Sequence, residues 1–314
     1  MRERKIIAVA GATGAQGGGL VRAILSDSNG EFAARALTRN PNSDGAKELA
    51  DLGAEVVEAD VGDLESLKRA YDGAYGAFCV TFFWEHFSPE KEKEHAKNMA
   101  EAAKAAELKH VIWSTLEDTR KWIPLDDDRM PTLMEKYKVP HFDAKWEAND
   151  YFSDLPVTYL LTSFYWDNLI HFGMGPQKND DGTYSFVLPM GDRKLPGMAS
   201  EDIGKCAYGI FRRGTDATGR TIGIAGEHLS GAEMAASLSK ALGKEVKHVS
   251  PPFDAYRGFG FPGAEDLGNM FQFNHDFADE FRAPRDVEQS RQLNPELKTF
   301  DQWLEQNGDR IPIE

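Results

Sequence analysis

The sequence predicts an α/β protein in which a doubly wound parallel sheet is followed by a smaller α+β part. Three observations indicate this fold class. Short apolar runs alternate with amphipathic helical patterns over the first half of the chain. The first apolar run ends in a glycine-rich turn, and the alternation of strand and helix patterns breaks down after residue 161.

The first strand, turn and helix are expected in the stretch KIIAVAGATGAQGGGLVRAIL, residues 5–25. Residues 6–10 are continuously apolar, as in a parallel strand that helices cover on both faces. Gly11, Gly14 and Gly17 follow at intervals of three, and glycine lets a pyrophosphate approach the backbone amides at the start of the next helix. This arrangement is typical of a Rossmann-type dinucleotide site, although glycine-rich turns also serve packing alone.

The second strand is expected over residues 31–37 and is followed by Arg39 and Asn40. In sheets of this type its end lies beside the adenosine ribose, where an acidic residue would bind a free 2′-hydroxyl. A guanidinium at that place favours a 2′-phosphate, so Arg39 predicts NADP(H) rather than NAD(H) as the cofactor. The alternative is a solvated loop arginine.

A short helix is expected over residues 46–52 and the third strand over residues 54–59, which Asp60 and Val61 close. Val61 can pack against the adenine while Asp60 bonds its amino group. The alternative is a cap for the next helix, a role for which Asp63 is better placed.

The fourth strand is expected over residues 74–81, with its carboxyl end facing the cofactor crevice. A long helix over residues 88–107 follows, and its inner stripe of Ala and Met is expected to be core packing. After a fifth strand over residues 110–114, the hydroxyls of Ser114 and Thr115 can meet substrate or the nicotinamide ribose, or cap locally.

The next expected helix covers residues 134–152 and carries His141 and Lys145 four residues apart on one face. A sixth strand follows over residues 156–161. The aromatic residues after it can wall the nicotinamide pocket or belong to the core.

We assign residues 1–156 to an NAD(P)-binding Rossmann domain. The smaller part, residues 157–314, is expected to serve substrate or partner and to interleave with the sheet through the sixth strand. Its expected elements are short strands over residues 183–189 and 220–225 and helices over residues 230–242 and 300–307. We expect this part to pack over the strand ends and close the crevice.

Composition excludes several partner classes. The chain has 314 residues and a formal net charge of −15, which disfavours direct nucleic-acid binding and leaves such a role to a protein partner. No apolar run approaches the roughly 20 residues that span a bilayer, so no membrane partner is expected. Cys79 and Cys206 predict reduced core residues and no metal site, and hence a cytoplasmic location that extends to the nucleus in a eukaryote.

Five segments carry a family resemblance: GATGAQGG (11–18), TRNP (38–41), HFDAK (141–145), FPGAEDLGNMFQF (261–273) and LNPELKTFDQWLEQ (293–306). In them the chain resembles the NmrA-like proteins, an atypical branch of the short-chain dehydrogenase/reductase superfamily. The resemblance covers essentially the whole chain. The last three segments are similar to the subgroup of NmrA-like family domain-containing protein 1, an NADPH sensor.

The resemblance implies that the glycine turn holds the pyrophosphate, that Arg39 recognises the 2′-phosphate and that Lys145 contacts the nicotinamide ribose. The cofactor-binding residues expected from sequence and resemblance together are Gly11, Ala12, Thr13, Gly14, Ala15, Gln16, Gly17, Arg39, Asn40, Asp60, Val61, Thr81, Phe82, Phe83, Lys145, Tyr165, Trp166, Asp167 and Asn168. Close relatives carry further basic residues after TRNP, whereas this chain has Asn42 and Ser43, which weakens the expected preference for NADP(H).

In the superfamily a tyrosine four residues before the lysine transfers the proton during hydride transfer. Here His141 stands in its place, so the expected catalytic residues are Lys145 and His141. The resemblance favours a regulator that senses the NADPH/NADP+ ratio through protein partners. The alternative is an NADPH-dependent reductase of quinones or similar unsaturated carbonyls, with Lys145 or His141 supplying the proton. The oligomeric state stays open, with a homodimer among the expectations.

Overall fold

The computed structural model describes residues 4–313 and confirms the α/β fold class. Its centre is a seven-stranded sheet in the order β11-β6-β5-β4-β1-β2-β3, in which every pair of neighbours is parallel. The strands are β1 (Lys5–Val9), β2 (Phe32–Thr38), β3 (Glu55–Glu58), β4 (Gly76–Cys79), β5 (His110–Thr115), β6 (Val157–Leu161) and β11 (Thr221–Gly223). The order reverses between β1 and β4, and a ligand crevice forms at such a switch point.

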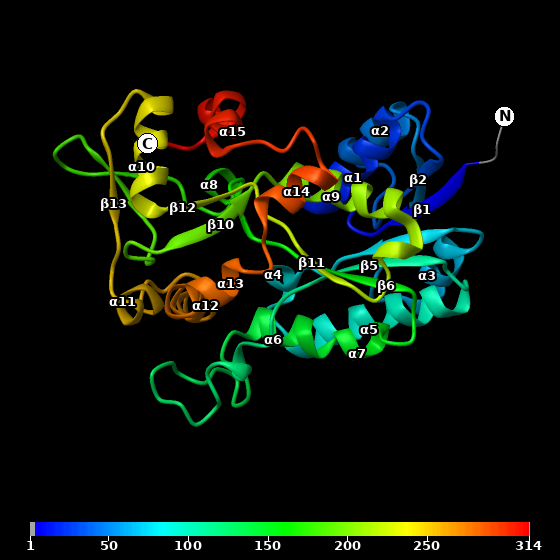
Figure 1. The fold of residues 1–314 in the computed structure, drawn as a ribbon, viewed down its shortest axis with the longest axis horizontal. Coiled ribbons are helices and arrows are strands. Elements are labelled where there is room, and N and C mark those ends of the chain that lie inside the picture. The colour runs from blue at the N-terminus through cyan, green and yellow to red at the C-terminus, as the bar shows by residue number, and fades with distance from the viewer. Residues whose placement is uncertain (1–3, 314) are drawn as a thin grey trace.

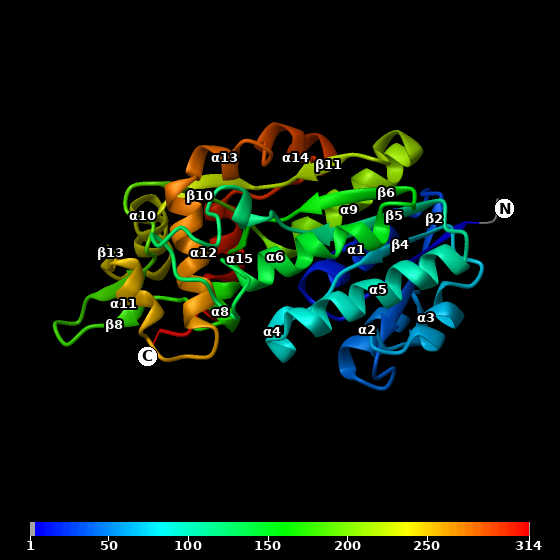
Figure 2. The same ribbon diagram turned by 90° about the horizontal axis from the view of Figure 1, so that it is seen from below.

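Helices cover both faces of this sheet (Figures 1 and 2). One face carries α1 (Ala15–Ser26), α2 (Asp44–Asp51), α9 (Ser200–Arg213) and α14 (Val287–Leu293), and the other carries α3 (Leu64–Tyr71), α5 (Pro89–Ala105) and α7 (Asn149–Phe152). The central strand β4 is therefore buried throughout, as its continuous apolar sequence predicts.

The helix that follows the glycine turn packs directly on a helix from the second half of the chain. Gly19 of α1 and Gly204 of α9 lie at the crossing point, where the two backbones touch. A Cβ atom on Gly204 would lie 2.0 Å from the backbone nitrogen of Leu20, and one on Gly19 would lie 2.4 Å from the carbonyl oxygen of Glu201. Only glycine fits at both positions, so α9 packs against α1 in direct backbone contact.

The smaller C-terminal part lies beyond the carboxyl ends of the parallel strands and has its own apolar core (Figure 1). It contains two three-stranded sheets, ordered β12-β10-β7 and β13-β9-β8. Their strands are β7 (Phe164–Tyr165), β8 (Gln177–Lys178), β9 (Tyr184–Val187), β10 (Lys194–Met198), β12 (Glu227–Ser230) and β13 (Val246–Val249). The helices there are α8 (Asn168–His171), α10 (Gly231–Leu242), α11 (Phe253–Arg257), α12 (Ala264–Asp276), α13 (Ala278–Arg282) and α15 (Phe300–Asn307). Among residues 4–313, no helix combines the length and the apolarity that crossing a membrane requires.

The prediction of one helix over residues 134–152 was wrong in its bounds. The structure has α6 (Pro140–Glu147) followed by the single turn of α7, and the chain before Pro140 forms a turn closed by a bridge between Leu133 and Tyr137. Proline disfavours helical geometry in the residue before it, and Val139 is accordingly extended. Pro140 itself suits the first turn of a helix, where its missing N–H is no loss.

Candidate active site

A cavity of about 1590 Å³ runs along the carboxyl ends of the central strands and continues into the C-terminal part. This volume exceeds the roughly 300–1,000 Å³ of a typical single-ligand site. The cavity therefore has room for a dinucleotide and a second molecule beside it.

The glycine turn forms one end of this cavity. Gly11 has a φ of +61°, a conformation that favours glycine, and α1 begins at Ala15 with Gly14 as a cap that lacks a capping side chain. The first backbone N–H groups of α1 consequently have no capping oxygen to bind, which suits an anion. Gly17 is needed for packing instead, because a Cβ there would lie 2.5 Å from the carbonyl oxygen of Gly11.

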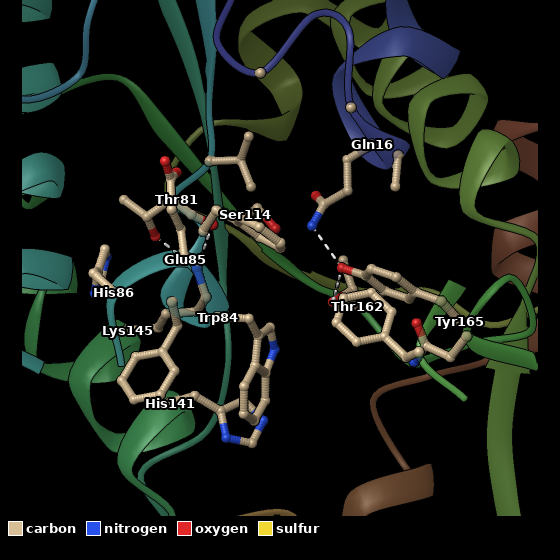
Figure 3. Close-up of a pocket in the computed structure, with 18 of the residues that line it drawn as sticks. Gln16, Thr81, Trp84, Glu85, His86, Ser114, His141, Lys145, Thr162 and Tyr165 are labelled. Carbon is tan, nitrogen blue, oxygen red and sulfur yellow. Dashed lines mark hydrogen bonds between the residues drawn. The ribbon is translucent and has the colours of Figure 1, made fainter. Parts of the chain in front are cut away.

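Gln16 and Tyr165 meet across the cavity, as Figure 3 shows. The Gln16 amide nitrogen donates to the Tyr165 hydroxyl at 2.6 Å, and this hydroxyl lies 3.4 Å from that of Thr162. Burial raises the pKa of Tyr165, although its two hydrogen bonds act in the opposite direction. Oε1 of Gln16 is buried and has no hydrogen-bond partner among residues 4–313, so it can accept a bond from a bound dinucleotide.

The end of the cavity beside β2 and β3 holds an ion pair between Arg39, which directly follows β2, and Glu85 of the short helix α4 (Phe83–His86). The Arg39 side chain is 63% exposed, so it can turn to a phosphate. Asp60 also lines this end, where its carboxylate accepts the Gly62 N–H at 2.8 Å. Asp63 caps α3, as its sequence position favours, and Asp60 is left out of that cap.

Lys145 projects from α6 into a buried polar cluster. Its ammonium lies 2.7 Å from a carboxylate oxygen of Glu92 and donates to the Thr81 hydroxyl at 2.6 Å. Glu92 is fully buried on α5, and its second oxygen lies 3.4 Å from Nε2 of His86. Burial raises the pKa of Glu92, but the Lys145 charge and the bonds from His86, Lys145 and Thr81 outweigh it and lower the pKa to about 2. Glu92 therefore holds the Lys145 ammonium in place.

His141, one turn before Lys145, is bound by a residue from the far end of the chain. Its Nδ1 lies 2.6 Å from one oxygen of Asp266, and its backbone N–H donates to the other oxygen at 3.2 Å. The imidazole packs on Trp84 with ring centroids 4.7 Å apart. Nε2 of His141 has no hydrogen-bond partner within residues 4–313, and the side chain lines the cavity. The pair can hold a proton on Nδ1 and exchange another at Nε2.

The structure brings most of the expected site residues together. Those that line the cavity are Gly11, Thr13, Gly14, Ala15, Gln16, Gly17, Arg39, Asn40, Asp60, Val61, Thr81, Phe82, Phe83, His141, Lys145, Tyr165, Asp167 and Asn168. Ala12 and Trp166 do not line it. Ala12 is fully buried in the core below the turn, and Trp166 packs against Phe300 and Trp303 of α15. The core alternative for the aromatic residues thus applies to Trp166, whereas Tyr165 lines the cavity and also packs against the apolar core.

Sequence reasoning missed Glu92, Glu85 and Asp266. Glu92 lies on a helix whose inner stripe is otherwise made of small apolar residues, so nothing marks it as buried. Asp266 belongs to one of the resemblance segments, but only the fold places it against the HFDAK segment. A buried carboxylate needs a cationic or donor partner, and that rule identifies both residues once their positions are known.

Comparison with known proteins places this geometry in a family. The sequence profile of the NmrA-like family matches residues 3–304. A curated relative, the NmrA-like family domain-containing oxidoreductase FrzB of a Cladobotryum species, is 29% identical over 301 residues, covering 90% of this chain and 88% of its own length.

Solved structures share the fold. The negative transcriptional regulator NmrA in complex with NAD superimposes with a TM-score of 0.77 at 22% identity, covering 96% of this chain and 95% of that one. Triphenylmethane reductase of a Citrobacter species, complexed with NADP(H), superimposes with a TM-score of 0.70 at 18% identity, covering 96% and 99%. The match over nearly the whole length, together with the glycine turn and the switch-point cavity, shows that this chain belongs to the NmrA-like family.

Proposed function

We propose that this protein is an NADP(H)-dependent reductase of quinones or similar unsaturated carbonyls. The observation that carries the proposal is the continuity of one cavity, which starts at the glycine turn and passes Lys145 to reach His141, whose ring is held by Asp266. The FrzB relative bears an oxidoreductase name, and the Citrobacter neighbour is a reductase complexed with NADP(H).

The residues that would hold NADP(H) fit its parts. The free N–H groups of α1 suit the pyrophosphate, Arg39 suits the 2′-phosphate, and Gln16 offers an unpaired buried oxygen. When bound, the reduced cofactor supplies a hydride to an electrophilic carbon. The Lys145 ammonium, held by Glu92 and Thr81, lines the same cavity and would place its positive charge beside the nicotinamide ribose.

His141 is better placed than Lys145 to transfer the proton. Lys145 is already bonded to Glu92 and Thr81, whereas Nε2 of His141 is unbonded within the described chain. A protonated His141 can donate from Nε2 to the carbonyl oxygen as the neighbouring carbon takes the hydride, leaving a neutral ring whose Nδ1–H still donates to Asp266. The Asp266 carboxylate orients the ring throughout.

The test follows NADPH absorbance with 1,4-naphthoquinone and with chalcone, an aromatic enone. We expect turnover in the wild type and a loss of about 100-fold or more in kcat for His141→Ala. Lys145→Ala should also lower turnover, with a larger effect on cofactor affinity. The proposal fails if the protein binds NADPH tightly but oxidises it with neither compound.

A second candidate is a regulator that reports the NADPH/NADP+ ratio through a protein partner. The Arg39–Glu85 ion pair can couple cofactor binding to α4, since a 2′-phosphate that takes Arg39 would release Glu85. NADPH and NADP+ both carry this phosphate, so the difference between them has to be read at the nicotinamide end of the cavity. A sensor needs different affinities for the two redox forms. Calorimetric titration with NADPH and NADP+ tests this, and equal affinities would reject the sensor.

A further inference from the structure

The end of the cavity beyond His141 has a lining of different chemistry from the dinucleotide end. Aromatic and aliphatic side chains dominate it, among them Phe164, Tyr256, Phe261, Met270 and Phe281. The charged residues that line the cavity come almost entirely from the first half of the chain. Of the described residues after 161, Asp167 alone contributes a charge to the lining, and its carboxylate accepts the backbone N–H of Ser200 at 2.8 Å.

A helix from the C-terminal part forms one wall of this apolar end. Leu267, Met270 and Asn274 of α12 line the cavity at positions i, i+3 and i+7, which share one helix face. Other residues of the same helix fix its place. The Asn269 amide donates to the carbonyl oxygen of Pro131 at 2.9 Å, and the Gln272 amide donates to the backbone near it.

Asn274 is the exception on this apolar face. Its side chain is 3% exposed, and Oδ1 has no hydrogen-bond partner within residues 4–313. The hydroxyl of Ser163, also buried and also lining the cavity, lacks a partner too. An unpaired buried amide costs about 1–3 kcal/mol, so an amide retained on an apolar wall indicates a ligand that satisfies it.

We propose that this end of the cavity is a substrate subsite for an uncharged, planar, largely aromatic molecule whose polar substituent the Asn274 amide hydrogen-bonds. The proposal rests on the reductase function, because it places the reacting carbonyl at His141. Asn274 lies eight residues beyond Asp266 on α12, or about 12 Å along the helix axis. The substituent therefore stands on the order of 10 Å from the reacting oxygen, across an aromatic ring.

The subsite disfavours anionic substituents for a physical reason. A carboxylate moved into this end would lose its hydration without gaining a counter-ion, because Asp167, the charged lining residue among the described residues after 161, is itself anionic. Aromatic rings on both sides suit a flat apolar body instead.

Binding without turnover tests the subsite. Calorimetry at pH 6.5, with NADP+ bound, compares chalcones that carry a hydroxyl, a methyl or a carboxylate at the 4-position. The methyl group matches the hydroxyl in size but forms no hydrogen bond. In the wild type we expect the hydroxyl compound to bind about fivefold more tightly than the methyl compound, and the carboxylate compound at least about tenfold more weakly than the methyl one.

Asn274→Leu should reduce the hydroxyl preference to less than about twofold, while Met270→Leu, one turn away on the same face, should keep it. Asn274→Ala tests the same bond without added bulk, and unchanged NADP+ affinity shows that a variant is folded. An unchanged hydroxyl preference in both Asn274 variants would overturn the proposal. Binding of the carboxylate compound as tight as that of the methyl compound would overturn it as well.

The same measurements distinguish failure of the subsite from failure of the proposed reductase function. If the hydroxyl preference depends on Asn274 but no chalcone oxidises NADPH, the subsite stands and the reductase does not. If NADP+ binds and no chalcone does, the subsite is overturned while the cofactor site is kept.

Discussion

Nδ1 of His141 lies 2.6 Å from the carboxylate of Asp266, a residue 125 positions further along the chain. The same carboxylate accepts the backbone N–H of His141, so the ring and its backbone are held by one group. This pair joins α6 of the Rossmann-type layer to α12 of the C-terminal part. It thereby makes the orientation of the proposed proton donor depend on how the two parts pack.

Replacing Asp266 by Asn should lower kcat by about 10- to 100-fold and leave KM within about twofold, because the substitution removes the negative charge beside the protonated ring and turns one of the two acceptor oxygens that hold His141 into a donor. The pH dependence of kcat should change as well, which a purely structural role would not predict. Asp279→Asn, at an exposed position of the neighbouring helix α13, is the matched control. A parallel rise in KM, or an unchanged pH profile, would contradict the assignment.

Replacing Arg39 by Ala should weaken NADPH binding by about tenfold and NADH binding by less than twofold, since only NADPH carries the 2′-phosphate. Calorimetric titration of both nucleotides measures the difference. Arg22→Ala is the control, because Arg22 forms a similar exposed ion pair with Glu48 outside the cavity. Equal losses for the two nucleotides would reject the 2′-phosphate contact.

Replacing Glu85 by Gln should have the opposite effect. Glu85 competes with the 2′-phosphate for Arg39, so its removal should tighten NADPH binding by about two- to fivefold and leave NADH unchanged. The gain should shrink as ionic strength rises, because the pair is exposed. Weaker NADPH binding would show instead that Glu85 itself contacts the cofactor.

Replacing Glu92 by Gln should reduce the free energy of unfolding at pH 7 by about 3 kcal/mol, because the largely buried Lys145 ammonium, whose side chain is 11% exposed, loses its counter-ion. The pKa of Glu92 is lowered from its ordinary value of 4.5 to about 2. Between these values the unfolded chain binds more protons than the native state, so the Glu92 contribution is complete above about pH 5 and fades as pH falls towards 2.

Urea denaturation at several pH values measures this contribution. The difference between wild type and Glu92→Gln should be constant from pH 8 to about 5 and decrease below that. Glu101→Gln, an exposed position on the same helix, is the control and should differ little from wild type at any pH. A difference that grows towards low pH would show that Glu92 is not ionised in the native state.

The sequence predicts the parallel layer well because its signals are local. Continuous apolar runs mark β1, β4 and β5, and the glycines at 11, 14 and 17 mark the turn to α1. The C-terminal part was harder to predict. Ser200–Arg213 and Ala264–Asp276 form long helices, yet the glycines and prolines near them obscure the periodicity that identifies a helix.

From the sequence, only those site residues could be predicted that follow the end of a strand. Arg39, Thr81 and Tyr165 do, and all three line the cavity. Glu92 and Asp266 act through partners 53 and 125 residues away, at Lys145 and His141, and no sequence period links such pairs. Asn274 is a polar residue on an otherwise apolar helix face, and it can be recognised as unusual only when that face is known to line the cavity.

The backbone contact between Gly19 and Gly204 has a consequence for how the chain can be divided. A fragment that stops before β6 would lose α9, expose the small-residue surface of α1 to water and leave the glycine turn without the helix on which α1 packs. We therefore expect the chain to bind a nucleotide only after both halves have been synthesised. Proteolytic halves should regain nucleotide affinity only when they are mixed.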